Sequence, residues 1–317
     1  MTQLQLNERA WQLVEETLAS RDECGLAVQR VEGGGRVIDC GIASRGGLAA
    51  GLFLARLTLS DLATVTLQAG DVAGVPCPQV VVATDSPVAA CMASQYAGWQ
   101  VSVGSYFAMG SGPMRAAYGR EKLFDRIGCR ETAEHLVGAL ETRTIPGSDV
   151  FQHLATRTEV EASAITLAVA PTASIAGGLQ VVARSVETAL HKLDELGLDL
   201  TRVAAGFGSA PLPPPAADDL AALGRTNDSV LYGSRVVLWV HGDDDSIATL
   251  GAATPSCTSR DHGSPFAEIF KRYDYDFYKI DPRLFSPAEV TFHNVDSGRT
   301  HAFGRLEPDL LRRSFFG

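Results

Sequence analysis

Arg184 and Glu187 are the residues of this chain whose types and spacing could perform acid–base chemistry. Side chains three apart on an α-helix lie on one face, so the guanidinium can orient the carboxylate, which can take a proton from water. The same spacing is also typical of a solvent-exposed ion pair, which contributes only about 0.2–0.5 kcal/mol. Spacing alone leaves both interpretations open.

The segment before this pair favours a ligand site. Residues 170–178 are uncharged and rich in small residues, and they connect an apolar run at 164–170, predicted to be a strand, to the predicted helix. Backbone amides at such a turn can approach a ligand closely, and a helix N-terminus offers unpaired N–H groups to anions. Thr172 and Ser174 in this turn are therefore candidates for substrate binding.

A second segment repeats this design. Residues 106–115 run from an apolar strand candidate through Gly110, Ser111 and Gly112 to Arg115. Two matching turns suggest two walls of one cleft, and a side chain at Gly112 would then occupy space that the ligand needs. The alternative is that glycine and serine merely allow close packing, because a single Gly-Ser-Gly is a weak signal.

Long motifs along the chain resemble those of the methenyltetrahydromethanopterin cyclohydrolase family. The resemblance covers nearly the whole chain. It is carried by VIDCG at 37–41, AGWQ at 97–100, GSYFAMGSGP at 104–113, APTASI at 170–175, GRTND at 224–228 and YDYDFYKIDP at 273–282.

The resemblance implies a mixed α/β fold with two closely joined lobes, a substrate cleft between them, and assembly as a homotrimer. It also implies that Arg184 and Glu187 are the catalytic pair. Tyr96 stands where archaeal members carry a lysine, which leaves open the shape of one cleft wall and the form of the pterin carrier. The substrate-binding candidates are Tyr96, Gly110, Ser111, Gly112, Arg115, Glu141, Thr172, Ser174, Arg225, Asn227, Asp228 and Lys279.

The implied reaction is reversible hydrolysis of the methenyl bridge of 5,10-methenyltetrahydromethanopterin, or its dephospho form, to the 5-formyl product in one-carbon metabolism. The bridge is an amidinium-like cation, so it is already activated and requires neither a metal nor another cofactor. Glu187 suits the role of base, a kind of assistance worth about 100- to 10,000-fold. The alternative is a non-catalytic pterin or one-carbon carrier-binding protein on the same fold.

Composition excludes several other classes of protein. The 317 residues are 45% hydrophobic and 20% charged, which is enough for a substantial core. A net charge of −10 without a clustered basic face argues against nucleic acid. The six cysteines lack metal or disulfide spacing, and no basic region followed by an apolar one begins the chain, so a cytoplasmic protein with reduced thiols is expected. Uncharged stretches at 86–114 and 162–183 contain too many small polar residues for lipid, and no membrane association is expected.

The expected organisation is an N-terminal α/β lobe at 1–150 and a C-terminal α/β lobe at 151–317, with an approximate boundary and lobes that can be discontinuous in sequence. Asn7 is predicted to cap a helix reaching about residue 19. One long helix is expected to carry Arg184 and Glu187 and to continue to about residue 196. Strands are expected at 35–40, 63–67, 79–83, 164–170 and 236–240, with a closing hairpin at 288–292 and 301–303.

Two polar segments have competing interpretations. Residues 241–245 (HGDDD) resemble a metal loop, but acidic residues after a strand more often form a solvated turn, so no metal site is predicted. The run from 273 to 281 is compatible with an ordinary strand of alternating faces, whereas the family resemblance favours a role in binding or subunit contact.

Overall fold

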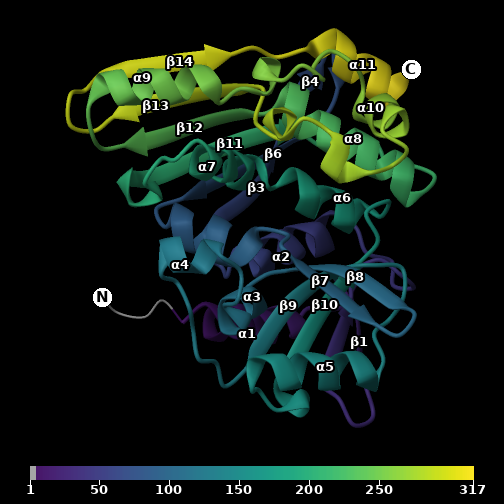
Figure 1. The fold of residues 1–317 in the computed structure, drawn as a ribbon. Helices are drawn as coiled ribbons and strands as arrows, with labels where there is room; N and C mark the ends of the chain where they lie inside the picture. The colour runs from purple at the N-terminus through teal and green to yellow at the C-terminus, as the bar shows by residue number, and fades with distance from the viewer. Residues whose placement is uncertain (1–4) are drawn as a thin grey trace. The chain divides into compact units, whose positions relative to one another are not determined.

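The computed structural model describes residues 5–317, which form two compact units (Figure 1). The first unit consists of the chain up to Ala63 together with Ala89–Gln180, and the second of Thr64–Val88 together with Val181–Gly317. Both units are therefore discontinuous in sequence. Residues 150 and 151, where an approximate boundary was expected, both lie inside the first unit.

The first unit contains a six-stranded sheet and the helices that cover it. Its strands are β1 (Ala27–Arg30), β2 (Arg36–Asp39), β7 (Trp99–Val103), β8 (Tyr106–Ser111), β9 (Leu136–Glu141) and β10 (Ile165–Ala170). Its helices are α1 (Leu6–Leu18), α2 (Leu48–Thr58), α3 (Met114–Tyr118), α4 (Leu123–Ile127) and α5 (Ser148–Thr158), with a 3₁₀ turn at Ala162–Ala164. The chain enters this unit in the π-helix η1 (Val88–Gln95) and leaves it in α6 (Ile175–Val182).

The strand order of this sheet is β1-β2-β10-β9-β8-β7. β10 pairs in parallel with both β2 and β9, while β1, β7 and β8 run antiparallel to their neighbours. The carboxyl ends of β2, β9 and β10 consequently meet at one edge, where ligands commonly bind in open α/β sheets. Asp39, Glu141 and Ala170 are the last residues of these three strands.

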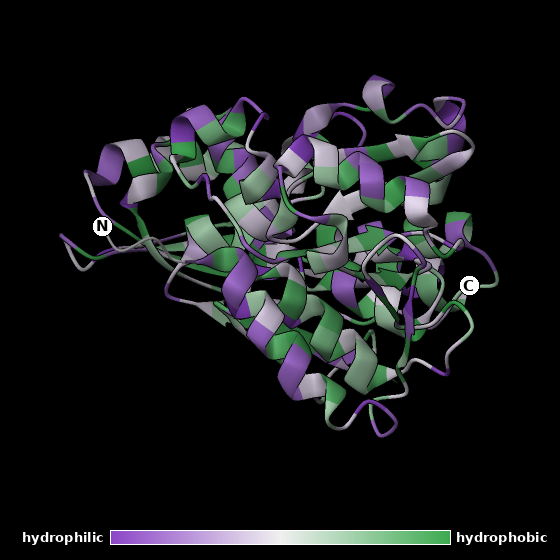
Figure 2. Cartoon of the chain, turned by 90° about the horizontal axis from the view of Figure 1, so that it is seen from below, coloured by the Kyte–Doolittle hydropathy of each residue, from purple (hydrophilic) through white to green (hydrophobic). Residues whose placement is uncertain are grey.

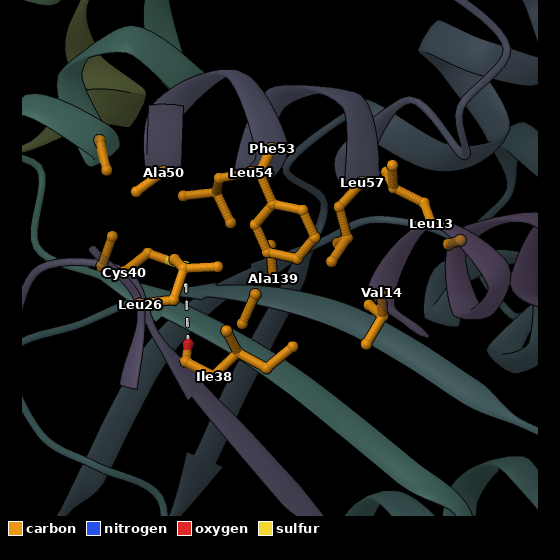
Figure 3. Close-up of a cluster of buried hydrophobic side chains, with 14 of the residues drawn as sticks. Leu13, Val14, Leu26, Ile38, Cys40, Ala50, Phe53, Leu54, Leu57 and Ala139 are labelled. Carbon is orange, nitrogen blue, oxygen red and sulfur yellow. Dashed lines mark hydrogen bonds between the residues drawn. The ribbon is translucent and has the colours of Figure 1, made fainter. Parts of the chain in front are cut away.

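Alternation along the central strands builds a core on each face of the sheet. Ile38 and Ala168 belong to a cluster with α1 and α2, whereas the adjacent Val37 and Leu167 belong to a cluster with α5. Figure 3 shows Phe53, Leu54 and other α2 side chains pointing toward those of the sheet. Helices in Figure 2 carry hydrophobic and hydrophilic residues along their length, as amphipathic helices do.

The second unit is built on a separate six-stranded sheet. Its strands are β3 (Thr64–Gln68), β6 (Gln79–Thr84), β11 (Val203–Pro211), β12 (Arg235–Val240), β13 (Glu289–Asn294) and β14 (Thr300–Gly304), and a small ladder joins β4 (Asp71–Val72) to β5 (Val75–Pro76). Its helices are α7 (Ser185–Glu195), α8 (Asp219–Gly233), α9 (Asp244–Ala253), α10 (Phe266–Arg272) and α11 (Pro308–Phe316). Short 3₁₀ turns are η3 (Leu200–Arg202), η4 (Ser256–Thr258), η5 (Phe277–Lys279) and η6 (Pro282–Leu284).

The order of this second sheet is β14-β13-β12-β11-β6-β3, and only β12 and β13 pair in parallel. Helices α7 and α8 both pack against β11. An aromatic cluster joins α8, α10 and α11 through Tyr232, Phe266 and Phe315. The second unit thus has its own hydrophobic core.

The predicted mixed α/β class is confirmed, as are the strands at 35–40, 63–67, 79–83, 164–170 and 236–240 and the closing hairpin. Two local predictions are wrong. Asn7 lies inside α1, where its buried side chain donates to Pro113 O and accepts from Val137 N, both at 2.9 Å. The expected long helix is divided into α6 and α7, and the segment at 273–281, for which a strand was one of two interpretations, contains the 3₁₀ turn η5 and no strand.

Candidate active site

The predicted catalytic pair lies at the beginning of α7. Ala183 and Arg184 form a turn after α6, so Arg184 is the N-cap residue of α7 and Glu187 is the third residue of that helix. The Arg184 carbonyl accepts the Thr188 N–H at 2.8 Å and so begins the helical hydrogen bonding. N-cap and third-residue side chains are neighbours in helices, so the break between α6 and α7 still leaves the pair adjacent.

The start of α7 is buried and contains unsatisfied polar atoms. Glu187 is only 6% exposed, and Ser185 is fully buried. The Arg184 Nε and Ser185 Oγ atoms are buried and have no hydrogen-bond partner among residues 5–317. Buried polar atoms without partners are costly and therefore often mark functional sites.

Close packing against β11 holds this helix start in place. A Cβ on Gly208 would lie 2.4 Å from Ser185 Oγ and 2.9 Å from Val186 Cγ2. Gly208 therefore lets the first turn of α7 approach the strand. Sequence reasoning missed both Ser185 and Gly208, although the small residues of β11 are a signal of close backbone approach.

In the first unit, Glu141 and Thr172 meet at the carboxyl edge of the parallel strands. The Thr172 hydroxyl donates to Glu141 Oε1. Ser174 follows two residues later and caps α6, since its Oγ accepts the Gly177 N–H at 3.0 Å and donates to Pro171 O at 2.8 Å. The structure thus brings together three predicted binding residues, and Glu141 and Thr172 are the two joined directly.

Asp39 organises the neighbouring loop at the same edge, a role that sequence reasoning did not assign. Its carboxylate accepts four backbone N–H bonds of 2.6–2.8 Å from Gly41 through Ser44. Burial alone would raise the pKa of Asp39, but these four bonds outweigh it and lower the pKa. A Cβ on Gly41 would lie 3.0 Å from Ser174 Cβ. The carboxylate therefore fixes a loop that packs against the turn after β10.

Arg115 is engaged entirely within the protein. It is fully buried and forms a bidentate salt bridge with Glu121, and its Nη1 donates to Met92 O at 2.9 Å. Its guanidinium lies 4.8 Å from the centre of the Tyr96 ring. The arginine thus fixes the end of the π-helix η1 and packs against the ring of Tyr96.

Gly110, Ser111 and Gly112 are also buried. A Cβ on Gly110 would lie 2.6 Å from Met114 Cε, and a Cβ on Gly112 would lie 3.4 Å from Gly138 Cα. Gly112 has φ +92°, a left-handed conformation that disfavours other residues. The absent side chains of both glycines therefore point into protein, which supports the packing interpretation of this segment.

The predicted residues of α8 make protein contacts. Arg225 Nη1 donates to Pro214 O and Pro215 O, and Asn227 Nδ2 donates to Leu223 O. Asp228 is fully buried, accepting from Phe266 N at 2.7 Å and Ser314 Oγ at 2.6 Å. Burial raises the pKa of Asp228 to about 7. Asp228 consequently connects α8 to α10 and α11 and has no free oxygen directed to solvent.

Lys279 is exposed on the second unit. Its Nζ is 3.8 Å from Asp276 Oδ2. The lysine lines a polar cavity formed by segments 258–260 and 278–283.

Asp243 and Asp244 in the acidic loop at 241–245 form hydrogen bonds within the protein. Asp243 caps α9 by accepting the Ser246 N–H, and Asp244 accepts from His301, Asn294 and Ser297. Among residues 5–317, no group of three or more His, Cys, Asp or Glu residues has an arrangement suited to a metal ion. No helix in the same part of the chain is long and apolar enough to cross a membrane.

The two sheets and the buried glutamate at a helix start define a mixed α/β protein with a candidate general base. The chain matches the family described as "Cyclohydrolase (MCH)" over residues 5–315, and it belongs to that family. The resemblance found in the sequence motifs is thereby confirmed.

Curated relatives carry the name methenyltetrahydromethanopterin cyclohydrolase. The protein of Rhodopirellula baltica is 51% identical over 290 residues, which are 89% of this chain and 86% of that protein. The protein of Methylobacterium sp. (strain 4-46) is 45% identical, covering 98% of this chain and 97% of its own length. That of Methanococcoides burtonii is 38% identical, with 98% of each chain covered.

Proposed function

We propose that this chain hydrolyses the methenyl bridge of 5,10-methenyltetrahydromethanopterin, or its dephospho form, to 5-formyltetrahydromethanopterin in a reversible reaction. Family membership and relatives of the same printed name at 38–51% identity support this activity. The structural observation that carries it is the buried Glu187 carboxylate beside Arg184 at the start of α7.

The first step is addition of water to the bridge carbon. Glu187 accepts a proton from the attacking water as the new C–O bond forms, and its negative charge also favours the cationic substrate. The carbon becomes tetrahedral, and the positive charge of the amidinium is lost. Glu187 lies in the first turn of α7, where the unpaired backbone N–H groups favour a negatively charged side chain.

The second step breaks one C–N bond. Glu187 returns its proton to the departing nitrogen, the C–N bond electrons go to that nitrogen, and the hydroxyl loses its proton as the formyl carbonyl forms. The overall change is the methenyl cation plus water giving the neutral formyl compound and one proton. Atoms and charge balance without an oxidant or reductant.

Arg184 is assigned to positioning the water and the tetrahedral centre. Its Nε has no hydrogen-bond partner among residues 5–317, so a donor is left for a ligand. An arginine with an unused donor can hydrogen-bond an oxygen that appears only during the reaction.

The remaining candidate residues, apart from Lys279, divide into two groups. We assign substrate contacts to Tyr96, Glu141, Thr172, Asn227 and Arg225, and the shaping of the site to Arg115, Asp228, Ser174 and the segment Gly110, Ser111 and Gly112. The second group is fully engaged within the protein or lacks a side chain that faces outward.

We further propose that the enzyme needs no cofactor, since the pterin carrier is itself the substrate and its bridge is already electrophilic. A cytoplasmic location is supported by the six cysteines, none of which forms a disulfide among residues 5–317. Assembly as a homotrimer is proposed from the family resemblance, and sedimentation velocity of the full chain tests it.

The direct test of the activity is the near-ultraviolet absorbance of the methenyl substrate, which falls when the ring opens. The enzyme accelerates this loss far above the spontaneous rate. A carrier-binding protein, the alternative function, would bind the methenyl compound without accelerating its hydrolysis. Measuring the phosphorylated carrier, the dephospho carrier and the folate analogue side by side identifies the preferred substrate.

A further inference from the structure

A cavity in the second unit lies outside the start of α7. It has a volume of about 650 Å³ and is lined by residues of segments 258–260 and 278–283. This volume lies within the range of about 300–1,000 Å³ that is typical of small-molecule sites. Neither Arg184 nor Glu187 lines it.

Cationic side chains dominate the lining of this cavity. Arg260, Lys279 and Arg283 contribute three positive charges against the single carboxylate of Asp281. The chain as a whole has a net charge of −10, so the net positive charge of this lining is opposite in sign to that of the whole chain. Local positive charge in a concave site concentrates anions near it.

The carboxylate of Asp281 is held by hydrogen bonds to both lining segments. Its Oδ2 accepts from Ser259 Oγ at 2.9 Å and from Arg260 N at 3.1 Å, and its Oδ1 accepts from Arg283 N at 3.1 Å. Burial alone would raise the pKa of Asp281, but these bonds outweigh it and lower the pKa. The carboxylate therefore ties the two lining segments together.

The carboxylate of Asp261 stabilises the same part of the chain. Asp261 is only 5% exposed and accepts from Asp281 N at 2.9 Å and from the Tyr273 hydroxyl at 2.9 Å. The two segments are thus held in a fixed relation by several hydrogen bonds. A preformed site loses less entropy when it binds a ligand.

The cations of the lining are poorly neutralised. Within residues 5–317, Arg260 and Arg283 form no salt bridge, and Lys279 has only the exposed contact of 3.8 Å to Asp276. Exposed pairs of this kind contribute little. The two arginines are therefore free to present planar hydrogen-bond donors to an anion, the geometry that suits phosphate oxygens.

A buried lysine of α7 adds to the positive charge near this cavity. Lys192 is 2% exposed, and its Nζ lies 3.9 Å from Glu195 Oε2. Burial lowers the pKa of Lys192, while Glu195 and Asp281 act to raise it and Arg283 to lower it. Lys192 therefore interacts electrostatically with two residues of the lining. It lies five residues after Glu187, about 7.5 Å along the helix axis.

We propose that this cavity is a binding site for a phosphate-bearing anion, with Arg260 and Arg283 as the principal ligands and Lys279 as a third cation. Its volume exceeds that of a single phosphate ion, so the occupant is the phosphorylated part of a larger molecule. Two sources have this chemistry: the phosphorylated end of the pterin carrier and a separate phosphorylated metabolite. Assignment to the carrier rests on the proposed function, whereas the anion site itself does not.

Titration calorimetry of the full chain with inorganic pyrophosphate tests the site. The wild type binds, and Arg260→Gln and Arg283→Gln each weaken binding about 10-fold or more, because each removes a charged donor pair. Arg312→Gln is the matched control, since it removes the same charge from an exposed arginine of α11 outside the cavity. Absence of wild-type binding, or equal weakening by Arg312→Gln, would overturn the proposal.

Kinetics with the two carriers distinguish the sources. If the carrier occupies the cavity, Arg260→Gln raises KM for the phosphorylated methenyl carrier and leaves KM for the dephospho form unchanged. If a separate metabolite occupies it, Arg260→Gln weakens pyrophosphate binding but leaves the KM values for both carriers unchanged. Either result supports the site. A wild-type protein that binds pyrophosphate but hydrolyses neither carrier would contradict the proposed function and leave the anion site standing.

Discussion

Glu187 is the third residue of helix α7, and Arg184 is the N-cap residue of that same helix. The carboxylate is buried, while the arginine Nε has no partner among residues 5–317. The two residues thus lie three apart at the start of one helix. This relationship separates their roles, with the glutamate acting as base and the arginine as a donor held for the reacting water.

Replacing Arg184 tests that separation. We expect Arg184→Ala to lower kcat/KM by about 100-fold or more, because a positioned donor contributes most in the transition state. Both KM and kcat change, since the side chain helps to bind and to orient. The melting temperature changes little, because the guanidinium Nε makes no hydrogen bond that would be lost.

Arg235→Ala is the control for Arg184→Ala, as Arg235 forms an exposed salt bridge with Glu289 in the same unit. It should leave both kinetic constants unchanged. A drop in melting temperature for Arg184→Ala with unaltered kinetics would instead make Arg184 a structural residue.

Replacing Gly112 distinguishes packing from substrate contact. The left-handed φ of +92° makes Gly112→Ala cost about 1–2 kcal/mol of stability. KM is expected to stay unchanged, because a Cβ there would face Gly138 and Ala139. Gly104→Ala is the control, because Gly104 also has a left-handed φ, +58°, but no atom lies within 4 Å of its Cβ position. A large rise in KM at an unchanged melting temperature would contradict the packing interpretation and would show that Gly112 contacts the substrate.

Much of the fold was predictable because it depends on local patterns. The apolar runs at 164–170 and 236–240 become buried strands, and Asp296-Ser297-Gly298 lies between the strands of the predicted hairpin. The break between α6 and α7 was not predictable, because apolar spacing continues through Val182 and Val186 while the chain turns at Ala183 and Arg184. Long-range hydrogen bonds likewise hold Asn7 inside a helix that it was expected to cap.

The candidate site was only partly predictable. Arg184 and Glu187 could be selected from residue type and spacing, and Thr172 from its turn. Glu121, which neutralises the buried Arg115, and Asp39, which holds four amides, gave no spacing signal, because their partners are set by the folded chain. The motif at 224–228 identifies Asp228 as a candidate, but it does not reveal that its carboxylate accepts from Phe266 N and Ser314 Oγ.

Asp228 provides a pH-dependent prediction. Burial raises its pKa to about 7 in the folded chain, from an ordinary value of 3.8. The folded state therefore binds the proton more tightly, and the stability that this gives is present below about pH 4 and lost as the pH rises toward 7. Asn resembles the protonated form, so the melting temperature of Asp228→Asn should increase relative to wild type between pH 5 and pH 8.

Asp309→Asn controls for this change, since Asp309 is an exposed aspartate of α11. Its melting temperature relative to wild type should not depend on pH. A difference between Asp228→Asn and wild type that stayed constant over this pH range would contradict the raised pKa of Asp228.

Chelation tests the proposed independence from metal. Prolonged treatment with EDTA, followed by its removal, should leave turnover unchanged, because the cationic bridge needs no Lewis acid. Turnover is measured in metal-free buffer with and without each common divalent ion. Loss of activity that one divalent ion restores would contradict this prediction and would make Asp243, Asp244 and Asp245 the first candidates for metal ligands.

The role of Glu187 as base is the central claim, and turnover of Glu187→Gln measures it most directly. Gln keeps the size of the side chain but cannot accept the proton, so kcat falls by about 100-fold or more while the affinity for the methenyl carrier stays within a few-fold. Glu195→Gln, at the exposed end of the same helix, should retain full turnover. The loss of methenyl absorbance, corrected for spontaneous hydrolysis, gives both values. Near-wild-type turnover by Glu187→Gln would contradict the account.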